Sequence, residues 1–532
     1  MNRSAFVRTL LAGSAFFMAS SAYAQDAEPQ PDPSDATADA AIAGAESVDD
    51  AQAKIELLQA QVEALQESLT QIQASMVKTT PSWKGAPLFE DKEAGWSFKV
   101  RGRLQYDVGY VSNPDDNPNG GLVTRNLGFN TRARRIRLGA EGTIPGGFGY
   151  KAEADFANGS VGFGDVILTY TPTNTQFNVA IGNQETNNGL EQISSSRWSS
   201  FIERAAFDDA FVNTRRLGIN LGYVSKAGDL RLNAGLWSGH SIDSTLDNEG
   251  WIGAARAVYA PLKGGNQLHF GLNYQHREFQ SNNNGATASG SGQASVNQIA
   301  RYRARPYSQL TDVRFVDTGN YAAKSDDIVG LEVAGIFKSL HIAAEGQYLK
   351  SNAYGTGDTL SNITGANTLN LFPGSVATVL VPDGNPSYYG GYIEAGYFLT
   401  GETRGYKNGT WDRTKVLKPF SKGGKGAIQL TGRVDYLDLD TGKLHQAFNN
   451  NFATGAFAAS NNYTRGGKQI GLQAGLTWIP EDYMRVLLNY SHAFVTGGTF
   501  ADEVSGLLSS NPDVADFDYG VDVVQARFQI DF

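Results

Sequence analysis

Apolar and polar residues alternate in two neighbouring segments, residues 99–107 (K-V-R-G-R-L-Q-Y-D) and 131–144 (T-R-A-R-R-I-R-L-G-A-E-G-T-I). Successive side chains of a strand point to opposite faces, so each segment has one charged and one apolar face. A soluble sheet turns its apolar face to a core, whereas a transmembrane barrel turns it to lipid and its charged face to a water-filled lumen. The charged faces carry Arg101, Arg103, Arg135 and Arg137.

The same period of two recurs from Trp96 to the C-terminus. It predicts about sixteen strands, an even number as expected of a bacterial outer-membrane barrel. The fold predicted for residues 96–532 is therefore an all-β, 16-stranded antiparallel transmembrane β-barrel. The strands that follow the opening pair are predicted at Tyr150–Phe156, Asp165–Tyr170, Gln176–Gly182, Arg216–Ser225, Leu230–Trp237, Trp251–Ala260, Gln267–Glu278, Ile328–Lys338, His341–Leu349, Tyr389–Leu399, Ala427–Asp438, Gln469–Ile479, Tyr483–Phe494 and Val521–Phe532.

The connections between these strands alternate in length. Tight turns such as Pro480–Asp482 alternate with long polar loops, as in barrels whose short turns face the periplasm. One connection, Thr400–Gly426, falls on the short-turn side and yet is long and basic. The long loops are predicted at Ser112–Asn130, Asn183–Arg215, Gln280–Asp327, Lys350–Ser387 and Thr441–Lys468.

The first 45 residues have the features of an exported protein. Arg3 and Arg8 precede the apolar stretch Leu10–Met18, and Ala22-Tyr23-Ala24 has the small-x-small form of a cleavage site. These features predict a Sec-type signal peptide over residues 1–24. The Ala/Asp/Pro-rich residues 25–45 lack periodicity and are predicted to be a disordered linker.

A heptad pattern follows the linker. Apolar residues alternate at spacings of three and four, with Glu and Gln between them, which predicts a periplasmic coiled coil over residues 46–78. A trimer is compatible with the mixed apolar seam, and a single amphipathic helix that packs on the barrel is the alternative. The seam consists of Val48, Ala51, Ile55, Leu58, Val62, Leu65, Leu69, Ile72 and Met76.

Composition excludes several classes of protein. The 532 residues include 61 glycines, 23 tyrosines and 28 phenylalanines but no cysteine, so disulfides, thiolate metal sites and cysteine nucleophiles are absent. After the N-terminus no apolar run is long enough for a transmembrane helix. The six histidines have no metal-ligand spacing, and no Gly-rich phosphate loop precedes a helix. We therefore expect no enzyme, no cofactor and no nucleic-acid partner.

The inward charges suggest what the barrel passes. Closure brings the last two strands beside the first two, which adds Arg485 and Arg527 to the four arginines above. Such a stripe of permanently charged, fork-shaped donors can pass anions along. Alternatively, the arginines only pair with lumenal carboxylates. Glu332, Glu345 and Glu394 on the facing strands favour that mixed wall, which gives weak selectivity.

Two connections carry further charge. Ile193, Trp198 and Phe201 are unusual in a loop facing water, so we predict that Asn183–Arg215 folds into the barrel and places Arg197 and Arg204 at a constriction. An amphipathic surface loop is the alternative.

The long connection Thr400–Gly426 is rich in lysine. Placed at the periplasmic mouth, this connection could draw anions through the pore. Its lysines are Lys415, Lys418, Lys422 and Lys425.

Several motifs resemble the phosphate-selective porin O/P family. They are A-R-R-I-R-L-G-A-E-G, F-G-Y-K-A-E-A-D-F, S-S-S-R-W-S-S-F-I-E-R, Y-F-L-T-G-E-T-R-G-Y and L-T-W-I-P-E-D-Y-M-R-V-L-L-N-Y-S-H, followed by the terminal Phe532. Where many relatives have G-x-x-K-x-P-F, this chain has G-N-Q-E-T-N-N over residues 182–188. This difference leaves anions other than phosphate open as the solute.

The resemblance implies a trimeric outer-membrane porin for passive diffusion of phosphate-like anions. Its third loop would fold inward, an arginine ladder would lead to the constriction, and lysines would line the periplasmic side. Phe532 would be the signal read by the barrel-assembly machinery. A weakly selective general porin, or a structural barrel that tethers the envelope through its coiled coil, remains an alternative function.

Overall fold

The computed structural model describes most of the chain after residue 47, in two units, residues 1–77 and 78–532. The predicted signal peptide and linker lie outside the described residues. Those are residues 48–79, 82–83, 85–114, 127–157, 159, 161–243, 250–279, 299–319, 321–353, 380–382, 384–441, 448–451, 456–459, 466–498 and 518–532.

The first unit consists, where described, of one long helix, α1 (Val48–Thr79). The helix lies over the heptad segment, and its pairing into a coiled coil stays a prediction. The described seam positions Ile55, Leu58, Val62, Leu65 and Leu69 are exposed, with Leu58 58% and Leu65 68% exposed. No helix within the described part of the chain has the length and apolarity needed to cross a bilayer.

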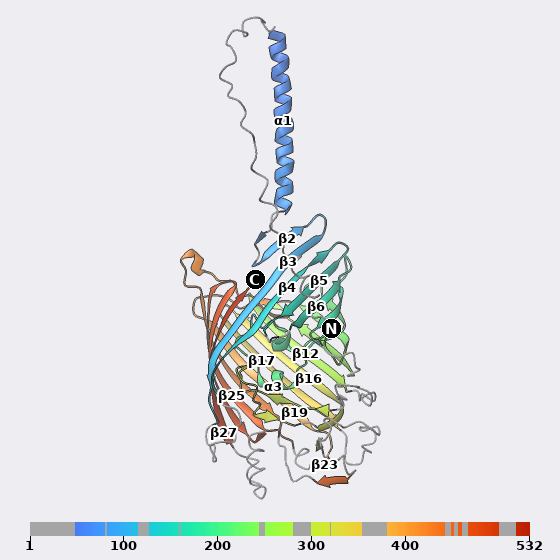
Figure 1. The fold of residues 1–532 in the computed structure, drawn as a ribbon, viewed down its shortest axis with the longest axis vertical. Helices are drawn as coiled ribbons and strands as arrows, with labels where there is room; N and C mark the ends of the chain where they lie inside the picture. The colour runs from blue at the N-terminus through green and yellow to red at the C-terminus, as the bar shows by residue number, and fades with distance from the viewer. Residues whose placement is uncertain are drawn as a thin grey trace, which may run out of the picture. The chain divides into compact units, whose positions relative to one another are not determined.

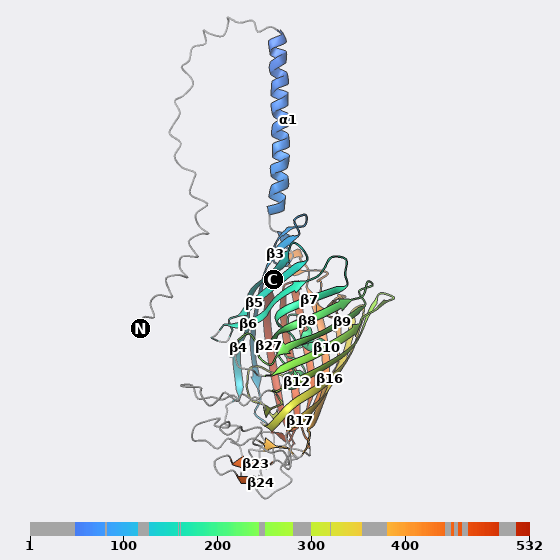
Figure 2. The ribbon, with the colours of Figure 1, turned by 90° about the vertical axis from the view of Figure 1, so that its right-hand side faces the viewer.

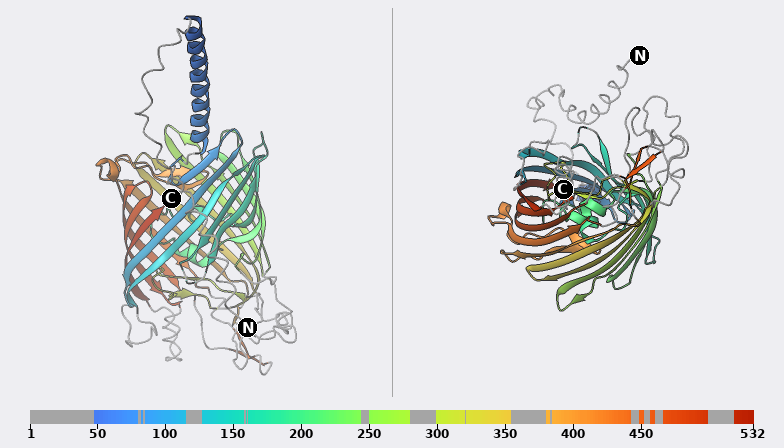
Figure 3. Two further views of the ribbon diagram at one scale, coloured as in Figure 1. Left: turned by 45° about the horizontal axis from the view of Figure 1, so that its top comes forward. Right: turned by 90° about the horizontal axis from the view of Figure 1, so that it is seen from below.

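The second unit is a closed barrel of sixteen antiparallel strands (Figures 1, 2 and 3). Each strand pairs with its neighbours in the chain, and β27 closes the sheet by pairing with β3. The strands are β3 (Trp96–Val111), β4 (Gly128–Ile144), β5 (Phe148–Asp155), β6 (Gly162–Tyr170), β7 (Phe177–Gln184), β8 (Arg216–Val224), β9 (Leu230–Ser238), β10 (Trp251–Tyr259), β12 (Asn266–Glu278), β16 (Tyr321–Phe337), β17 (Leu340–Ala353), β19 (Ser387–Phe398), β22 (Ala427–Asp438), β25 (Lys468–Glu481), β26 (Met484–Thr496) and β27 (Asp518–Asp531).

Short elements accompany the barrel. β1 (Ser82–Trp83) and β2 (Pro87–Asp91) extend the sheet beside β3. The others lie in connections between barrel strands. They are α2 (Leu190–Ile193), α3 (Ala206–Phe211), β11 (Leu262–Lys263), β13 (Ile299–Ala300), β14 (Arg303–Ala304), β15 (Val316–Asp317), β18 (Leu380–Val381), β20 (Gly405–Lys407), β21 (Thr410–Asp412), η4 (Phe420–Lys422), β23 (Phe448–Asn451) and β24 (Ala456–Ala459).

All predicted strands are confirmed, although several are longer than predicted. β16 begins at Tyr321 rather than Ile328. Its first half contains Lys324, Ser325 and Asp326, so the apolar alternation that marks the rest of the strand is missing there. Hydrogen bonding to β12 and β17 continues through this polar part, which a hydrophobic pattern cannot detect.

The two faces of the barrel differ as predicted. Large apolar side chains on the outer face remain exposed, for example Leu138, Leu331 and Ile393. Charged and amide side chains that alternate with them are buried inside. An apolar exterior around a polar interior suits lipid outside and water inside.

The C-terminal residue is bound to the first barrel strand. Gly102 donates its N–H to the Phe532 carbonyl (2.9 Å), and Phe532 donates its N–H to the Gly102 carbonyl (3.0 Å). The Phe532 ring lies over the glycine, since a Cβ at residue 102 would come within 2.2 Å of it. The last residue thus helps to close the sheet.

We predict that Gly102→Val destabilises the folded barrel by about 1–3 kcal/mol, because the new side chain must displace the Phe532 ring. The loss of the folded, fast-migrating band on electrophoresis as urea concentration rises measures this effect. Gly432→Val on β22 is the control, because a Cβ there meets nothing within 4 Å. Equal stability of the two variants would contradict the prediction.

Candidate functional site

The loop between β7 and β8, residues 185–215, folds into the barrel and confirms the predicted inward course. Its backbone is fixed to the far wall, where Ile202 N–H donates to Asn489 Oδ1 (2.7 Å) and Ala206 N–H donates to Asp435 Oδ2 (3.0 Å). Phe201, Phe207 and Phe211 are at most 1% exposed. Phe201, which is unusual in a surface loop, therefore holds the loop against the wall together with Phe207 and Phe211.

Arg433 of β22 joins this loop to the strands. Its Nη2 donates to Glu191 of α2 (2.5 Å) and to Glu394 of β19 (2.6 Å). Its guanidinium also stacks on Phe201 at 4.7 Å and on Tyr392 at 4.4 Å. A buried cation shared by two carboxylates and two rings makes this one of the firm attachments of the loop.

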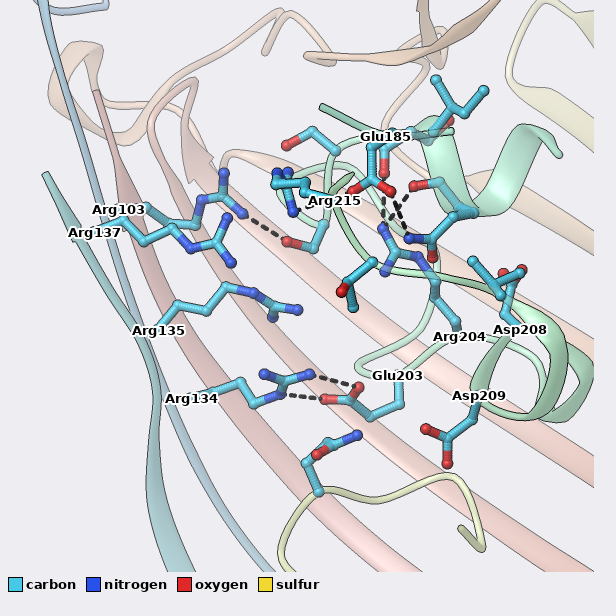
Figure 4. A pocket seen from close by; sticks show the side chains of 18 of the residues that line it. Arg103, Arg134, Arg135, Arg137, Glu185, Glu203, Arg204, Asp208, Asp209 and Arg215 are labelled. Atoms are coloured by element: carbon cyan, nitrogen blue, oxygen red, sulfur yellow. Dashed lines mark hydrogen bonds and ion pairs between the residues drawn. The ribbon is translucent and has the colours of Figure 1, made fainter. Parts of the chain in front are cut away.

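The opposite wall carries a column of arginines on β3 and β4. A β-bulge interrupts the pairing of these strands, because Gln105 faces Arg135 whereas Tyr106 faces Ala133. Arg134 is the extra residue, and its side chain turns inward to Glu203 of the loop (3.0 Å). Strict alternation sends Arg134 outward, which is why sequence reasoning missed it. The column, shown in Figure 4, is Arg134, Arg135, Arg103 and Arg137.

Carboxylates neutralise this column only in part. Glu153 of β5 lies within ion-pair distance of three arginines: Arg137 at 2.7 Å, Arg197 at 3.6 Å and Arg103 at 3.7 Å. Asp155 adds a second partner for Arg137 (2.7 Å). Since two carboxylates serve three guanidinium groups, this part of the wall keeps an excess of positive charge.

Arg135 has no carboxylate partner among the described residues. It donates to the amide oxygen of Gln105 (2.8 Å), while its Nε has no hydrogen-bond acceptor. Its neighbour Glu203 is fully engaged by Arg134 and Arg527. Burial would raise the pKa of the Glu203 carboxyl, but these two arginines hold that pKa well below its ordinary value.

A cavity of about 500 Å³ separates the arginine column from the loop. The column lines one side, and Glu185, Glu203, Asp208 and Asp209 lie on the other (Figure 4). Hydroxyl and amide groups fill most of the remaining lining, with few apolar side chains. Positively and negatively charged side chains therefore face the same cavity, and the guanidinium groups are concentrated on β3 and β4.

The predicted constriction residues lie at this cavity in different ways. Arg204 lines the cavity, but it donates to the carbonyls of Glu191, Gln192 and Ser194 and so also braces its own loop. Arg197 is 3% exposed and lies against Glu153. Burial and the neighbouring Arg101 lower the pKa of Arg197 to about 10, which leaves it charged at neutral pH.

The remaining predicted arginines divide into two groups. Arg101, paired with Glu141, lines the cavity beside Arg103 and Arg137. Arg527 instead forms a two-bond pair with Asp107 (2.6 and 2.7 Å) across the closing strands, outside the cavity lining. Arg485 also lies outside that lining and donates to loop carbonyls of Arg197 and Ser199.

The inward carboxylates of the mixed wall are where the sequence predicts them. Glu332 binds Arg256 through two hydrogen bonds (2.9 and 2.6 Å), and Glu394 binds Arg433. Glu345 accepts the Glu191 N–H (2.9 Å) and has no cation within ion-pair distance in the described chain. The loop covers Glu345 and Glu394, so they hold the loop rather than line the cavity.

The connection between β19 and β22, residues 399–426, also enters the barrel. Trp411 of its β20–β21 hairpin is buried, and its N–H donates to Ser194 of the inward loop (3.0 Å). Arg404 of the same connection donates to the Trp198 carbonyl (2.6 Å). The four predicted lysines, in contrast, are exposed and form no ion pair in the described structure. They are Lys415, Lys418, Lys422 and Lys425.

A third insertion corrects the prediction of a purely external loop over residues 280–327. Within its described part, Tyr302 and Tyr307 are buried inside the barrel. Tyr307 donates its hydroxyl to Asp435 (2.9 Å), and Arg305 pairs with Asp209 of α3 (3.1 Å). The aromatic run R-Y-R-A-R-P-Y at residues 301–307 is the sequence signal that marks this segment.

Besides Arg134, two further candidate residues could not be predicted from the sequence. Lys151 and Arg215 line the cavity and share Asp165 as a partner, although they come from a strand and from the end of a loop. Only the closed barrel brings them together. Within the described residues, no group of three or more His, Asp or Glu side chains is arranged to hold a metal ion.

The chain resembles known porins. A family model described as phosphate-selective porin O and P matches residues 98–532. An uncharacterized protein of Caulobacter vibrioides is 33% identical over 464 residues, which cover 85% of this chain and 77% of that protein. Porin O of Pseudomonas aeruginosa is 31% identical over 199 residues, which cover 35% of this chain and 43% of that porin.

Solved structures also match. The anion-selective porin from Comamonas acidovorans has 14% identity and a TM-score of 0.42, over 82% of this chain and 100% of that one. In-vitro folded OmpT of Vibrio cholerae, in its trimer form, has 12% identity and a TM-score of 0.39, over 82% and 99%.

The family match and the barrel fold indicate a channel rather than an enzyme. The match spans nearly the whole barrel, from β3 to Phe532. The chain therefore belongs to the phosphate-selective porin O and P family and is a porin of the Gram-negative outer membrane.

Proposed function

We propose that this porin passes anions by passive diffusion and favours phosphate or a related oxyanion. The observation that carries the proposal is the arginine column, in which Arg135 faces the cavity without a carboxylate partner. A guanidinium group keeps its charge at any physiological pH and presents donors that match an oxyanion. The family description also names phosphate.

The route follows the column toward the periplasm. An anion passes from Arg134 to Arg135, then between Arg103 and Arg137, and leaves past Arg101. Most of these groups are shared with a carboxylate, so each attracts an anion without holding it tightly. Conduction needs this balance, because a site must be favourable to enter and weak enough to leave.

The four exposed lysines of the 399–426 connection extend this field to the mouth of the pore. Charges of one sign at a channel entrance raise the local concentration of the opposite ion. Lys415, Lys418, Lys422 and Lys425 would thus draw anions through and favour their passage over that of cations.

A weakly selective general porin is the second candidate, and the carboxylates at the cavity favour it. Glu153, Glu185 and Glu203 counter much of the positive charge. A wall of mixed sign produces a transverse field and only slight anion preference. The excess of arginines around Glu153 and the unpaired Arg135 favour the anion pore over this alternative.

We also propose that the protein is a homotrimer to which α1 contributes. The helix exposes its apolar seam along the described positions Ile55, Leu58, Val62, Leu65 and Leu69. Exposed heptad seams are covered when helices of several copies associate. A structural role, in which α1 tethers the envelope, is the alternative for this segment.

We predict that changing Arg101, Arg103 and Arg135 together to alanine lowers anion conductance about fivefold at low salt. This factor corresponds to a loss of roughly 1 kcal/mol of electrostatic attraction between the anion and the wall of a water-filled lumen. Planar-bilayer recordings at low and high salt measure it, and the loss should shrink as screening grows. Arg231→Ala on β9 is the control, because Arg231 lies outside the cavity lining. An unchanged low-salt conductance would remove the arginine column from the anion route.

The reversal potential of the unmodified porin in a phosphate gradient tests the function directly. We expect a potential set by the anion, because the unpaired guanidinium charge repels cations. An anion-to-cation permeability ratio near one would instead select the general porin.

We predict that Leu65→Cys forms disulfide-linked copies in the membrane, whereas Glu67→Cys does not. The native chain has no cysteine, and only the seam position approaches its equivalent in a coiled coil. Non-reducing electrophoresis of oxidised membranes measures the cross-link. If neither variant cross-links, the next test is deletion of residues 48–76. A weakened envelope with unchanged conductance would then identify α1 as a tether.

A further inference from the structure

The outer face of the barrel has an apolar hollow of about 490 Å³, away from the arginine column. It lies over the neighbouring strands β16, β17, β19 and β22, the first three of which are labelled in Figure 1. Gly346 of β17 and Gly391 of β19 are direct partners in the sheet and form the floor. Large outward-facing side chains surround them. These are Leu331, Val333, Tyr389, Ile393, Val434 and Tyr436.

The two floor glycines differ in what the backbone requires. A Cβ at Gly391 would lie 2.7 Å from the Glu345 carbonyl oxygen, so close packing of the strands excludes a side chain there. A Cβ at Gly346 would meet its nearest atom, the Gly390 carbonyl oxygen, at an ordinary contact distance of 3.5 Å. A glycine inside a strand weakens it and often marks the close approach of a ligand. Gly346 therefore provides open space that the packing of the strands does not need.

Hydrocarbon is the medium that this hollow faces. The outer surface of the barrel is apolar, and the lining of the hollow is almost entirely apolar as well. An unfilled hollow would lose the dispersion contacts that its walls could make. A flexible acyl chain of the bilayer can enter a space of this size and restore those contacts.

The hollow lies in the half of the barrel near the long loops. Tyr348 and Tyr389 are partners two residues beyond the floor glycines in the direction of those loops, on the same outward face. Tyrosine side chains gather where the hydrocarbon of a bilayer meets its headgroups. Because the short turns of such barrels face the periplasm, the hollow lies in the outer leaflet, just below the headgroups.

Two outward-facing lysines flank the hollow at the level of these headgroups. Lys350 of β17 is exposed and has no carboxylate within ion-pair distance in the described chain. Its partner on β16, Asp327, accepts the Tyr274 hydroxyl (2.6 Å) on the side away from Lys350. On the other flank, the Lys468 side chain is 44% exposed and lies 3.7 Å from Asp438. Both ammonium groups can therefore reach an anionic headgroup.

We propose that this hollow is a binding site for one phosphorylated lipid of the outer leaflet. One acyl chain lies over Gly346 and Gly391, and the phosphate-bearing headgroup lies at Lys350 and Lys468. The positive charge of the lysines complements such a headgroup. A second copy of the chain over the hollow would bury these lysines and Asp327, which favours a lipid as the occupant. The site is outside the lumen, so the proposal is independent of the solute that the pore passes.

The experiment measures lipid binding to the detergent-solubilised full-length porin by native mass spectrometry. The probes are lipid A, which carries phosphate groups, and the same lipid after removal of its phosphates. We expect one tightly held lipid A per chain, with a dissociation constant about three- to tenfold lower than that of the dephosphorylated form. One or two exposed charge pairs have an effect of this size. Equal binding of the two forms would overturn the proposal.

A substitution that fills the hollow tests the place of the acyl chain. Gly346→Leu should weaken lipid A binding about fivefold, because the new side chain takes the place of the acyl chain and its contacts. Gly432→Leu on β22 is the matched control, since residue 432 lies outside the lining of the hollow and a Cβ there meets nothing within 4 Å. Equal lipid binding by the two variants would contradict the assignment of the hollow.

The lysines are tested separately. Lys350→Gln combined with Lys468→Gln should lower lipid A binding to the level of the dephosphorylated lipid, whereas Lys226→Gln, at an exposed lysine of a short turn, should leave it unchanged. Full binding by the double variant would reject the headgroup contacts. The fast-migrating band verifies that each variant is folded.

The oligomeric state distinguishes a lipid from a second copy of the chain. With a lipid in the hollow, Gly346→Leu lowers lipid binding and leaves the assembly intact. Dissociation of the assembly by Gly346→Leu with unchanged lipid binding would mean that another copy covers the hollow, and the proposal would be wrong.

Discussion

Closure of the sheet by β27 and β3 is the interaction on which the rest of the structure depends. In hydrocarbon an unpaired strand edge leaves backbone N–H and C=O groups without partners, so a membrane-spanning sheet must close. The Asp107–Arg527 pair strengthens this closure from inside, and the backbone bonds between Gly102 and Phe532 strengthen it at the end of the chain. Closure also brings β26 and β27 beside the arginine column, so the charged wall exists only in the finished barrel.

Three segments then divide the lumen unequally. The β7–β8 loop, the segment around Tyr302 and Tyr307, and the β20–β21 hairpin fill the side of β16 to β26, where they bury acidic side chains. The cavity lies on the opposite side, beside β3 to β6. The arginines of β3 and β4 line this cavity, whereas Glu345 and Glu394 hold the loop. The asymmetry of charge across the pore is thus a consequence of which wall the inserted segments cover.

The sequence predicts the strands well because lipid on one face and water on the other impose a period of two. It also predicts that the β7–β8 loop turns inward, from apolar residues such as Phe201. The fine structure of the site is less predictable, for physical reasons. Arg134 enters the lumen through a bulge, which breaks the alternation. Arg527 lies on the inward face as expected, but its partner Asp107 comes from the opposite end of the chain. Asp208 depends on how α3 is seated, which no local pattern records.

The bulge in β4 has an evolutionary consequence. An inserted residue in a strand ordinarily reverses the orientation of every side chain beyond it, but here the distortion is confined to one position, and both flanking stretches keep their apolar side toward lipid. Two consecutive guanidinium groups therefore face the cavity. Single-residue insertions or deletions at this point can change the number of charges that a solute meets while strand count and diameter stay constant. Related barrels can thus acquire new solute preferences without rebuilding their scaffold.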